Sequence, residues 1–309
     1  MIILLNRSSN NGNGLRKWEE VRSELEGKYL GHDYRLIYDA EDLIKYLQQE
    51  LDRGERTVVA AGGDGTVNFL LNKLMKLEEE QRRQVIFGAI GLGSSNDFHK
   101  PASEEHRLNG KVLFKLDYRN AVAHNIGRVD YVDEKGMRQR RFFMINCSLG
   151  VIAQANYFFN SGDGLLNWLK PRFVQGAIYY AAVKTIVSAR NIPAKIAIAD
   201  SIHSTDVTTL SVVINPHVSG NFSYDLDVNP QSHFFGVALC ERMGIAERLK
   251  TLFFLAQSKF QGLPKTRSWK VKSLEIQPAS LTALELDGEV CLARDIKIQL
   301  LQGYLRVCQ

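Results

Sequence analysis

The sequence predicts an α/β protein with an N-terminal parallel-sheet domain and a C-terminal domain that is an antiparallel β-sandwich. First, apolar strand-like runs alternate with helical patterns over residues 1–100, which is typical of strand–helix–strand units. Second, the period changes near residue 111, and short runs that alternate apolar and polar residues follow. Third, glycine-rich loops follow three of the predicted N-terminal strands. A chain of 309 residues is long enough for two such domains.

The predicted elements follow one another in a regular order. In the first part, the expected strands are 2–5, 34–38, 58–61 and 85–90. Apolar residues at helical spacing lie between them, at Leu15, Trp18, Val21 and Leu25, at Leu43, Ile44, Leu47 and Leu51, and at Phe69, Leu70, Leu74 and Leu77. In the β-rich part, helices are expected at 175–189 and 245–258. We therefore place the two domains at 1–120 and 121–293.

The most informative segment is the string Gly62-Gly63-Asp64-Gly65-Thr66, which joins a predicted strand to a predicted helix. Glycines let the backbone approach an anion, and the N–H groups and dipole of a helix N-terminus favour negative charge. The segment therefore predicts a phosphate-binding loop, although it contains no lysine and is not the P-loop motif. Asp64 would repel a phosphate unless it holds a metal ion, orders the turn or contacts the reacting groups. The alternative is a strand–helix turn that simply requires glycine.

Two further loops of similar composition follow predicted strands. One is Gly91-Leu92-Gly93-Ser94-Ser95-Asn96-Asp97-Phe98, and the other runs from Asn6 to Gly14. Ligands of open α/β sheets bind outside the carboxyl ends of the strands. We therefore expect the three loops to converge on one site.

Together these motifs resemble those of the diacylglycerol kinase catalytic family, which includes bacterial lipid kinases and the sphingosine and ceramide kinases. The resemblance runs nearly end to end, because further segments fall in family order and spacing at 125–129, 143–150 and 287–289. The string at 62–66 also occurs in NAD kinases and phosphofructokinases. The Asn-Asp-Phe string at 96–98 and the Asp-Gly-Glu string at 287–289 narrow the resemblance to lipid kinases.

The resemblance implies an ATP- and Mg²⁺-dependent kinase that transfers the γ-phosphate to the hydroxyl of diacylglycerol or a related lipid. Residues 1–120 would bind ATP, with the closing strand 294–309 able to return to this domain as it does in the family, and 121–293 would bind the lipid. Phosphoryl transfer depends mainly on positioning and charge neutralisation, which the three loops would supply. The residues expected to bind the nucleotide are Asn6, Ser8, Ser9, Asn10, Gly62, Gly63, Asp64, Gly65, Thr66, Asn68, Ser94 and Asn96.

The acceptor hydroxyl needs a base, and the resemblance places catalytic acids at Asp287 and Glu289, with Asp64 as a third. In an extended segment, residues two apart face the same side, so one carboxylate could accept the proton while the other holds Mg²⁺ or a donor. The spacing alone also fits an ordinary Asp-Gly hairpin turn. Which of the two carboxylates is the base is left open.

Three departures from the family pattern bear on function. The first loop, at 6–10, lacks the proline and the glycine that the family carries there. Asn125 stands where the family has an aspartate. Ser232 and Gly236 replace the two aspartates that bind a structural magnesium ion in bacterial relatives. Because magnesium favours charged oxygen ligands, we expect that this structural site is absent.

The composition is that of an ordinary globular protein, with 45% hydrophobic and 24% charged residues. No apolar stretch approaches the length of a membrane span, so a cytoplasmic location is expected. The net charge of +5 is compatible with anionic lipid surfaces or anionic substrates. The four cysteines and seven histidines show no metal-ligand spacing, and we assign none of them to a metal.

The expected partners are a lipid substrate and a membrane that the protein contacts peripherally. No nucleic acid partner is expected, and a homodimer is left open. The candidate membrane patch combines large apolar residues with cations, a mixture that suits a membrane interface, and consists of Leu165, Leu166, Trp168, Leu169, Lys170 and Arg172. The alternative is a core-packing loop with two surface charges.

Two other functions remain open at this point. An NAD kinase is disfavoured because the β-rich part lacks a second segment of the Thr-Gly-Ser-Thr kind that NAD kinases carry. A catalytically inactive nucleotide- or lipid-binding regulator is favoured by the departures in the first loop and at Asn125, and disfavoured by the intact glycine-rich and Asp-Gly-Glu strings.

Overall fold

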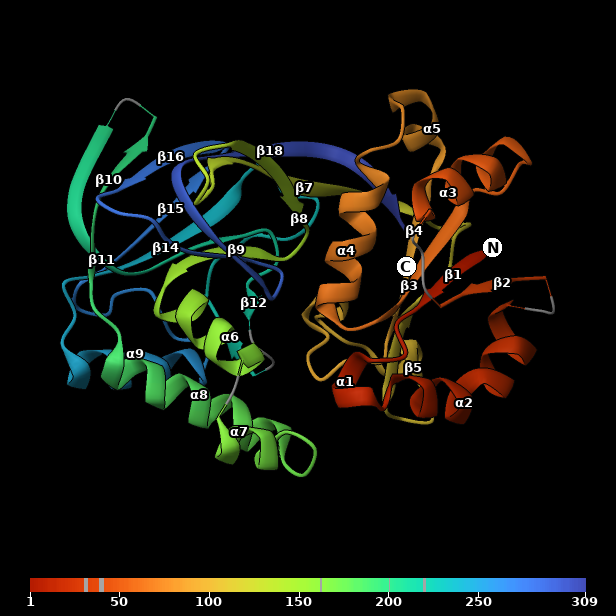
Figure 1. The fold of residues 1–309 in the computed structure, drawn as a ribbon, viewed down its shortest axis with the longest axis horizontal. Coiled ribbons are helices and arrows are strands. Elements are labelled where there is room, and N and C mark those ends of the chain that lie inside the picture. The colour runs from red at the N-terminus through yellow and green to blue at the C-terminus, as the bar shows by residue number, and fades with distance from the viewer. Residues whose placement is uncertain (31–32, 39–41, 162, 200, 219–220) are drawn as a thin grey trace. The chain divides into compact units, whose positions relative to one another are not determined.

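The computed structural model describes residues 1–30, 33–38, 42–161, 163–199, 201–218 and 221–309. The chain forms two compact units (Figure 1). The first unit comprises Met1–His124 together with Gly303–Gln309, and the second comprises Asn125–Gln302. The prediction of a mixed α/β protein is confirmed.

The first unit contains a sheet whose central strands are parallel, in the order β2-β1-β3-β4. The last residues of β18 add to β4 in parallel, and β6 pairs with β4 in the antiparallel direction. The strands of this unit are β1 (Ile2–Leu5), β2 (Arg35–Ile37), β3 (Thr57–Gly62), β4 (Ile86–Gly91), β5 (Arg107–Leu108) and β6 (Val112–Lys115). Because β1 and β3 are buried along their whole length, their sequences are continuous apolar runs rather than alternating ones.

Helices connect the parallel strands of the first unit. On α2, Trp18, Val21 and Leu25 lie at helical spacing and are buried in the core with Ile3. Leu15, which the pattern also assigns to this face, is exposed instead. The helices are α1 (Ser9–Gly12), α2 (Gly14–Leu25), a π-helical turn (Glu26–Leu30), α3 (Leu43–Asp52), α4 (Asp64–Leu74), α5 (Glu79–Gln84) and the 3₁₀ turns Asp97–His99 and Glu104–His106.

The second unit is built from antiparallel strands whose pairing closes on itself. The circuit of paired strands runs β9-β11-β10-β16-β18-β17 and back to β9. Strand β14 pairs with β11, and β15 pairs with β14. Strand β7 pairs with β18 and with β8. The strands are β7 (Val122–Val132), β8 (Arg138–Phe143), β9 (Asn146–Gly150), β10 (Ile192–Ile198), β11 (Ser201–Val213), β12 (His217–Val218), β13 (Phe222–Ser223), β14 (Phe235–Glu241), β15 (Thr266–Val271), β16 (Ser273–Pro278), β17 (Thr282–Leu286) and β18 (Glu289–Val307).

This barrel-like sheet corrects the prediction of a two-sheet sandwich. The cause is the length of two strands, because β11 has 13 residues and β18 has 19. The first half of β11 pairs with β10 and its second half with β9. In the same way, β18 pairs with β17 near its start and with β16 farther along. Period-two patterning marks each strand but does not reveal that one long strand joins two sets of neighbours.

Among the described residues of this unit, four helices accompany the sheet: α6 (Val151–Ser161), α7 (Gly164–Leu169), α8 (Val174–Ser188) and α9 (Ile245–Leu255). Helix α8 packs against α6, α7 and α9. The two expected helices are therefore present, whereas α6 and α7 had no clear pattern in the sequence. None of the helices in the described part of the chain is both long enough and apolar enough to span a membrane.

Candidate active site

The three predicted loops of the first unit are linked to one another by side-chain hydrogen bonds. Asn6 at the end of β1 donates through Nδ2 to Thr66 Oγ1 at 3.0 Å. Ser94 after β4 donates through Oγ to Asn10 Oδ1 at 2.9 Å. Ser8 contributes its N–H, which donates to Asn6 Oδ1 at 3.0 Å. The loops therefore converge at the carboxyl ends of β1, β3 and β4, as the sequence predicts.

The first loop is not an open loop, because α1 begins at Ser9. The helix is a single turn, and Asn10 has a φ of 51°. Asparagine is one of the few residues that adopts this left-handed conformation readily. Asn10, which bonds Ser94, stands where the family pattern has a glycine, and it adopts the left-handed conformation that glycine also favours.

Glycine is required where the loops after β3 and β4 meet. A Cβ on Gly63 would lie 3.1 Å from the Gly93 Cα, and a Cβ on Gly93 would overlap the backbone of Gly63. The two backbones thus approach more closely than side chains permit. The N–H of Thr66 donates to the Gly63 carbonyl at 2.9 Å, so this amide is already engaged within the turn.

Asp64 orders the neighbouring loop. Its Oδ2 accepts from the Asp97 N–H at 3.0 Å, and its Oδ1 accepts from the Phe98 N–H at 3.1 Å. Asp97 is itself buried and pairs with Lys100 at 2.7 Å. Of the three roles open to Asp64 from the sequence, the structure shows the ordering of the turn.

The remaining predicted nucleotide residues occupy different surroundings. Asn96 uses both amide atoms within its own loop, accepting from the Gly93 N–H at 3.2 Å and donating to the Gly93 carbonyl at 3.3 Å. Asn68 is buried on α4, where its Oδ1 accepts from Asn72 at 3.1 Å. Asn96 therefore shapes the loop, and Asn68 lies inside the unit beneath the helix N-terminus.

Lys17 is a cation of this cluster that the sequence analysis missed. From α2 its Nζ donates to the carbonyl of Gly93 at 3.2 Å. Burial lowers the pKa of Lys17 below its usual value. The sequence signal for Lys17 is its place directly after the asparagine-rich loop, on the helix that follows. In the structure, Lys17 lies on the side of this helix opposite the exposed Leu15 and next to the buried Trp18 in the sequence.

The Asp-Gly-Glu string of the second unit forms a tight hairpin turn. Asp287 and Gly288 have φ values of 48° and 93°, and the flanking Leu286 and Glu289 pair across the β17–β18 hairpin. Two left-handed central residues match the twist of antiparallel strands. The prediction that Asp287 and Glu289 share one side of an extended segment is therefore wrong, because the chain reverses between them.

Asp287 is a structural anchor, whereas Glu289 is exposed. The Asp287 carboxylate is 2% exposed and accepts from the N–H groups of Met144, Ile145 and Asn146 at 2.8, 2.9 and 3.0 Å. It thereby fixes the connection between β8 and β9. Glu289 begins β18 with its side chain exposed to solvent.

Glu285 is a further carboxylate at this turn that the sequence analysis missed. It is buried on β17, and its Oε1 accepts from the Gly288 N–H at 2.5 Å. With the Asn146 amide oriented so that its nitrogen faces Glu285, that nitrogen donates to Oε2 at 2.8 Å. The sequence signal for Glu285 is the alternation of acids at Glu285, Asp287 and Glu289, whereas the family string covers only the last two.

The segment around Ser232 is held by Asn125. The Asn125 side-chain nitrogen donates to the Ser232 carbonyl, and its N–H donates to the Pro230 carbonyl at 2.7 Å. Ser232 Oγ accepts from the Asn229 N–H at 2.9 Å. An amide can donate to a carbonyl whereas an aspartate cannot, so the asparagine at 125 suits a segment closed by hydrogen bonds.

Magnesium would not find a ready-made cage among the described residues. None of their His, Cys, Asp and Glu side chains form a group of three or more that could hold a metal ion. Asp64 and Asp287 both accept backbone amides. Magnesium that arrives with ATP takes most of its ligands from phosphates and water. The donor set fits such a nucleotide-borne ion better than a resident one.

The candidate membrane patch is only partly at the surface. Leu166 is fully buried, and Lys170 is 9% exposed with its Nζ 4.7 Å from the Phe159 ring centre. These two residues therefore do not belong to a surface patch, and burial lowers the pKa of Lys170. Leu165 and Trp168 are exposed, and the Arg172 guanidinium lies 4.9 Å from the Trp168 ring centre.

Comparison with known proteins finds similar sequences for these features. Residues 1–118 match the model of the diacylglycerol kinase catalytic domain. Over 102 residues the chain is 36% identical to a "Probable lipid kinase YegS-like" of Cronobacter sakazakii, a match that covers 32% of this chain and about a third, 33%, of that relative. A Staphylococcus aureus protein named as a lipid kinase is 23% identical over 297 residues, which are 93% of this chain and 90% of the relative.

The fold has a counterpart among solved structures. The crystal structure of a Bacillus anthracis protein, described as a "putative diacylglycerol kinase", superposes with a TM-score of 0.72. It covers 99% of this chain and 94% of that one at 17% sequence identity, which establishes the shared fold. The segment that matches the diacylglycerol kinase catalytic-domain model, residues 1–118, is the one that carries the three glycine-rich loops.

Proposed function

We propose that the protein is an ATP-dependent lipid kinase that transfers the γ-phosphate of ATP to the hydroxyl of diacylglycerol or a related lipid. The observation that carries the proposal is the convergence of three loops at the carboxyl ends of β1, β3 and β4, in the segment that matches the kinase family. The lipid kinase names of the relatives support a lipid acceptor. We further propose that the reaction takes place on the cytoplasmic side of a membrane, where ATP is available.

In this proposal the first unit holds the nucleotide. The N-terminus of α4 follows Gly63 directly and presents the positive end of its dipole to the phosphates. The close approach of Gly63 and Gly93 keeps side chains out of the phosphate path. Lys17 would supply a positive charge from the neighbouring helix, and Asp64 would act by holding the loop that carries Ser94.

The second unit would supply the base. The lipid oxygen attacks the γ-phosphorus, the bond from that phosphorus to the oxygen bridging the β- and γ-phosphates breaks, and ADP leaves with that oxygen. The proton of the lipid hydroxyl goes to a carboxylate. We assign this role to Glu289, because Asp287 already accepts three backbone amides. Magnesium bound to the ATP phosphates would neutralise charge, and the protein's contribution is to orient the reactants.

A catalytically inactive nucleotide-binding regulator is the second candidate function. It is favoured by one observation, namely that Asp64 and Asp287, two of the three predicted catalytic acids, both hold backbone loops. Such a protein would bind ATP and would not turn it over.

Incubation with [γ-³²P]ATP, Mg²⁺ and single purified lipids, followed by thin-layer chromatography, tests the proposal. The panel contains diacylglycerol, phosphatidylglycerol, a sphingoid base and an undecaprenol-like alcohol. If the protein is a lipid kinase, we expect one labelled lipid product. The control variant is Glu275→Gln, which should label this product as well as the parent does, because Glu275 is an exposed acid on β16 that pairs with Lys297. ATP binding by calorimetry without any labelled lipid would favour the inactive regulator.

A further inference from the structure

Helix α8 exposes a stripe of apolar side chains. Tyr179, Val183 and Val187 follow one another at four-residue intervals, so they lie on one face of the helix, and they are between 39% and 56% exposed. The helix contains no acidic residue. Its opposite face packs into the unit and consists of Ala177, Ala181, Thr185 and Ile186.

Helix α9 repeats this arrangement. Ile245, Leu249 and Phe253 have the same four-residue spacing and are between 38% and 63% exposed. The buried side of α9 carries Arg248, Thr251 and Leu255. An ordinary surface helix places its apolar residues toward the core. Two neighbouring helices that both expose an apolar row indicate a surface that is covered during function.

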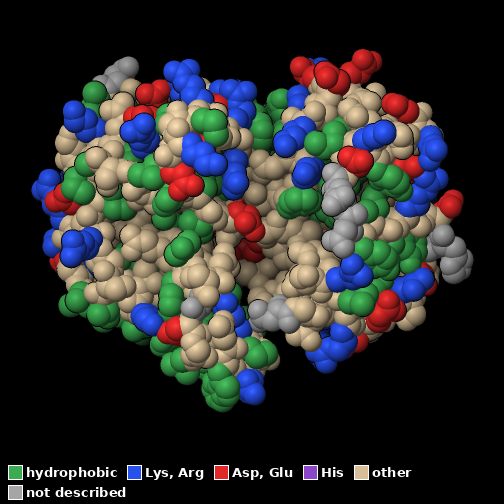
Figure 2. Space-filling model, viewed as in Figure 1, with side chains coloured by type: hydrophobic (Ala, Val, Ile, Leu, Met, Phe, Trp, Pro, Cys, Tyr) green, Lys and Arg blue, Asp and Glu red, His purple; other side chains and the backbone are tan. Residues whose placement is uncertain are grey.

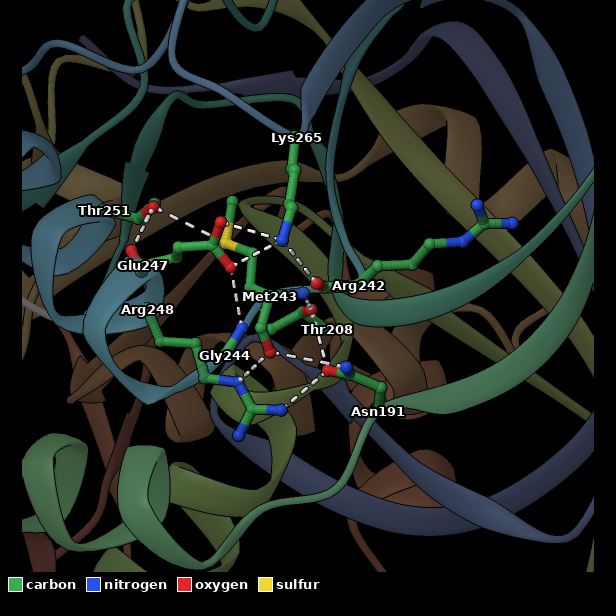
Figure 3. A network of polar contacts seen from close by, with 9 residues as sticks. All are labelled: Asn191, Thr208, Arg242, Met243, Gly244, Glu247, Arg248, Thr251 and Lys265. Atoms are coloured by element: carbon green, nitrogen blue, oxygen red, sulfur yellow. Dashed lines mark hydrogen bonds and ion pairs between the residues drawn. The ribbon is translucent and has the colours of Figure 1, made fainter.

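Arg248 fixes the two helices to each other, and Figure 3 shows the part of its contacts that reaches Asn191 and Met243. From the buried side of α9, its guanidinium donates to the carbonyls of Ile186 and Ala189 at the end of α8, at 3.1 and 2.7 Å. It also donates to Asn191 Oδ1 at 2.6 Å and to the Met243 carbonyl at 3.1 Å. A cation at a helix C-terminus is favoured by the helix dipole. The end of α8 is thereby held against the start of α9.

The same surface continues onto α7. Leu165 and Trp168 lie on α7, Phe173 directly precedes α8, and all three are at least half exposed. Figure 2 shows hydrophobic side chains gathered along the lower edge of the second unit, where Figure 1 places α7, α8 and α9. We call the exposed apolar residues of α7, α8 and α9 the helical face. A contiguous apolar surface of this kind is typical of an interaction site rather than of scattered surface residues.

Cations predominate around the helical face, and the nearby acids Asp163 and Glu247 are paired with Lys184 and Lys265. Between Gly164 and Arg190 the sequence has four Lys or Arg residues and no Asp or Glu. Arg172 and Arg190 are exposed, and Lys250 on α9 lies next to Leu249 in the sequence and is exposed as well. Arg172 stacks on Trp168, a residue that prefers the headgroup region of a membrane. Apolar residues bordered by cations complement a surface that is apolar within and anionic at its headgroups.

We propose that the helical face of α7, α8 and α9 docks on an anionic lipid bilayer. The apolar rows enter the boundary between headgroups and acyl chains, and the surrounding cations meet anionic phosphates. This inference deepens the proposed function and rests on it in one respect, because a kinase with a lipid acceptor must reach that lipid in a membrane. It replaces the patch expected from the sequence, in which Leu166 and Lys170 were assigned to the surface.

Vesicle co-sedimentation without nucleotide tests the docking directly. The full chain is spun with vesicles of phosphatidylcholine alone or mixed with phosphatidylglycerol. We expect binding mainly to the mixed vesicles, and a reduction of roughly tenfold or more for the double variant Val187→Asn/Phe253→Asn, because each side chain loses apolar area to bury. The matched control is Ile202→Asn, since Ile202 is 72% exposed on β11, outside the helical face. Arg172→Glu/Arg190→Glu should abolish the preference for anionic vesicles.

Three results would overturn the docking proposal. One is a parent protein that binds neither type of vesicle. Another is a double variant that binds as well as the Ile202→Asn control. The third is a parent that sediments as a dimer and a double variant that is monomeric, with no difference in vesicle binding, which would make a second copy the occupant.

A second assay separates the docking from the kinase reaction. The double variant should phosphorylate a short-chain, water-soluble diacylglycerol at the parent's rate and a vesicle-embedded one more slowly. If no lipid is phosphorylated by any variant while vesicle binding still depends on the helical face, the kinase proposal fails and the docking inference stands. Equal rates of parent and double variant on embedded lipid would contradict the docking inference alone.

Discussion

The glycine-rich loops of the first unit and the acidic turn of the second unit both contain an aspartate that accepts backbone amides. Asp64 joins two loops that follow neighbouring parallel strands and accepts two amides. Asp287 sits in a hairpin turn, is almost fully buried and accepts three. The difference lies in what is accessible nearby, namely the half-buried backbone of Gly63 and Gly65 in the first region and the exposed Glu289 carboxylate in the second. An aspartate within a conspicuous motif can thus order the backbone around it, and in the proposed reaction the chemistry is assigned to its neighbours.

The largest effect is expected for Asp287→Ala. The change leaves three buried amides without an acceptor, each of which costs about 1–3 kcal/mol. The free energy of unfolding should therefore fall by roughly 3 kcal/mol or more, measured by urea denaturation. Glu289→Ala, two residues away and exposed, is the matched control and should fall by less than about 0.5 kcal/mol. Equal losses in the two variants would erase the distinction between anchor and exposed acid.

Gly93→Ala is expected to damage the first region in a similar way. The added Cβ would overlap the Gly63 backbone, and overpacking of this kind costs about 1–3 kcal/mol. Calorimetry should also show a large loss of ATP affinity, because the loops can no longer approach each other. Gly27→Ala serves as the control, since a Cβ at Gly27 meets nothing within 4 Å. Undiminished ATP affinity in Gly93→Ala would remove the close approach of the loops from the nucleotide site.

Acid should weaken the first region through His99. This residue ends the 97–99 turn, and burial lowers its pKa to about 3 from an ordinary value of 6.5. The folded state therefore stays unprotonated while the unfolded state takes up a proton, so this contribution to stability is complete above pH 6.5 and is lost as the pH falls below it. The expected loss is about 2 kcal/mol at pH 5. His99→Gln should flatten the pH dependence of urea unfolding between about pH 5 and pH 7, and an unaltered pH dependence in this variant would contradict the role of His99.

The smallest effect is expected for Asn125→Asp, which restores the residue of the family pattern. A carboxylate cannot donate to the Ser232 carbonyl, so the variant should lose about 1–2 kcal/mol of stability. Thermal melting with and without Mg²⁺ checks this expectation. If Mg²⁺ raised the melting temperature of the variant by several degrees, the 229–236 segment would still bind the metal ion, and hydrogen bonds from Asn125 would not be what replaces it.

The loops of the first unit could be predicted from sequence because each signal is local. Gly62 to Thr66 lie between a buried strand and a helix, and parallel strands bring their carboxyl ends to one edge. The contacts that organise them could not be predicted in this way. Asn6 meets Thr66, and Lys17 meets Gly93, across many intervening residues.

The acidic turn was harder to interpret for a physical reason. The string at 287–289 fits both an extended segment and a hairpin, and the choice depends on whether the flanking strands pair with each other. The partners of Asp287 lie at 144–146, far away in the sequence. The α8 row of the helical face could not be predicted for the opposite reason, because α8 is apolar on most sides and its sequence does not show which side is buried.

The most direct test of the account is the turnover of Glu289→Gln with diacylglycerol in mixed micelles. If Glu289 is the general base, the parent phosphorylates the lipid and the variant loses about 10²-fold in kcat. The melting temperature and the ATP affinity of the variant should stay unchanged. Near-parental turnover in Glu289→Gln, or a parent that binds ATP and phosphorylates none of the offered lipids, would contradict it.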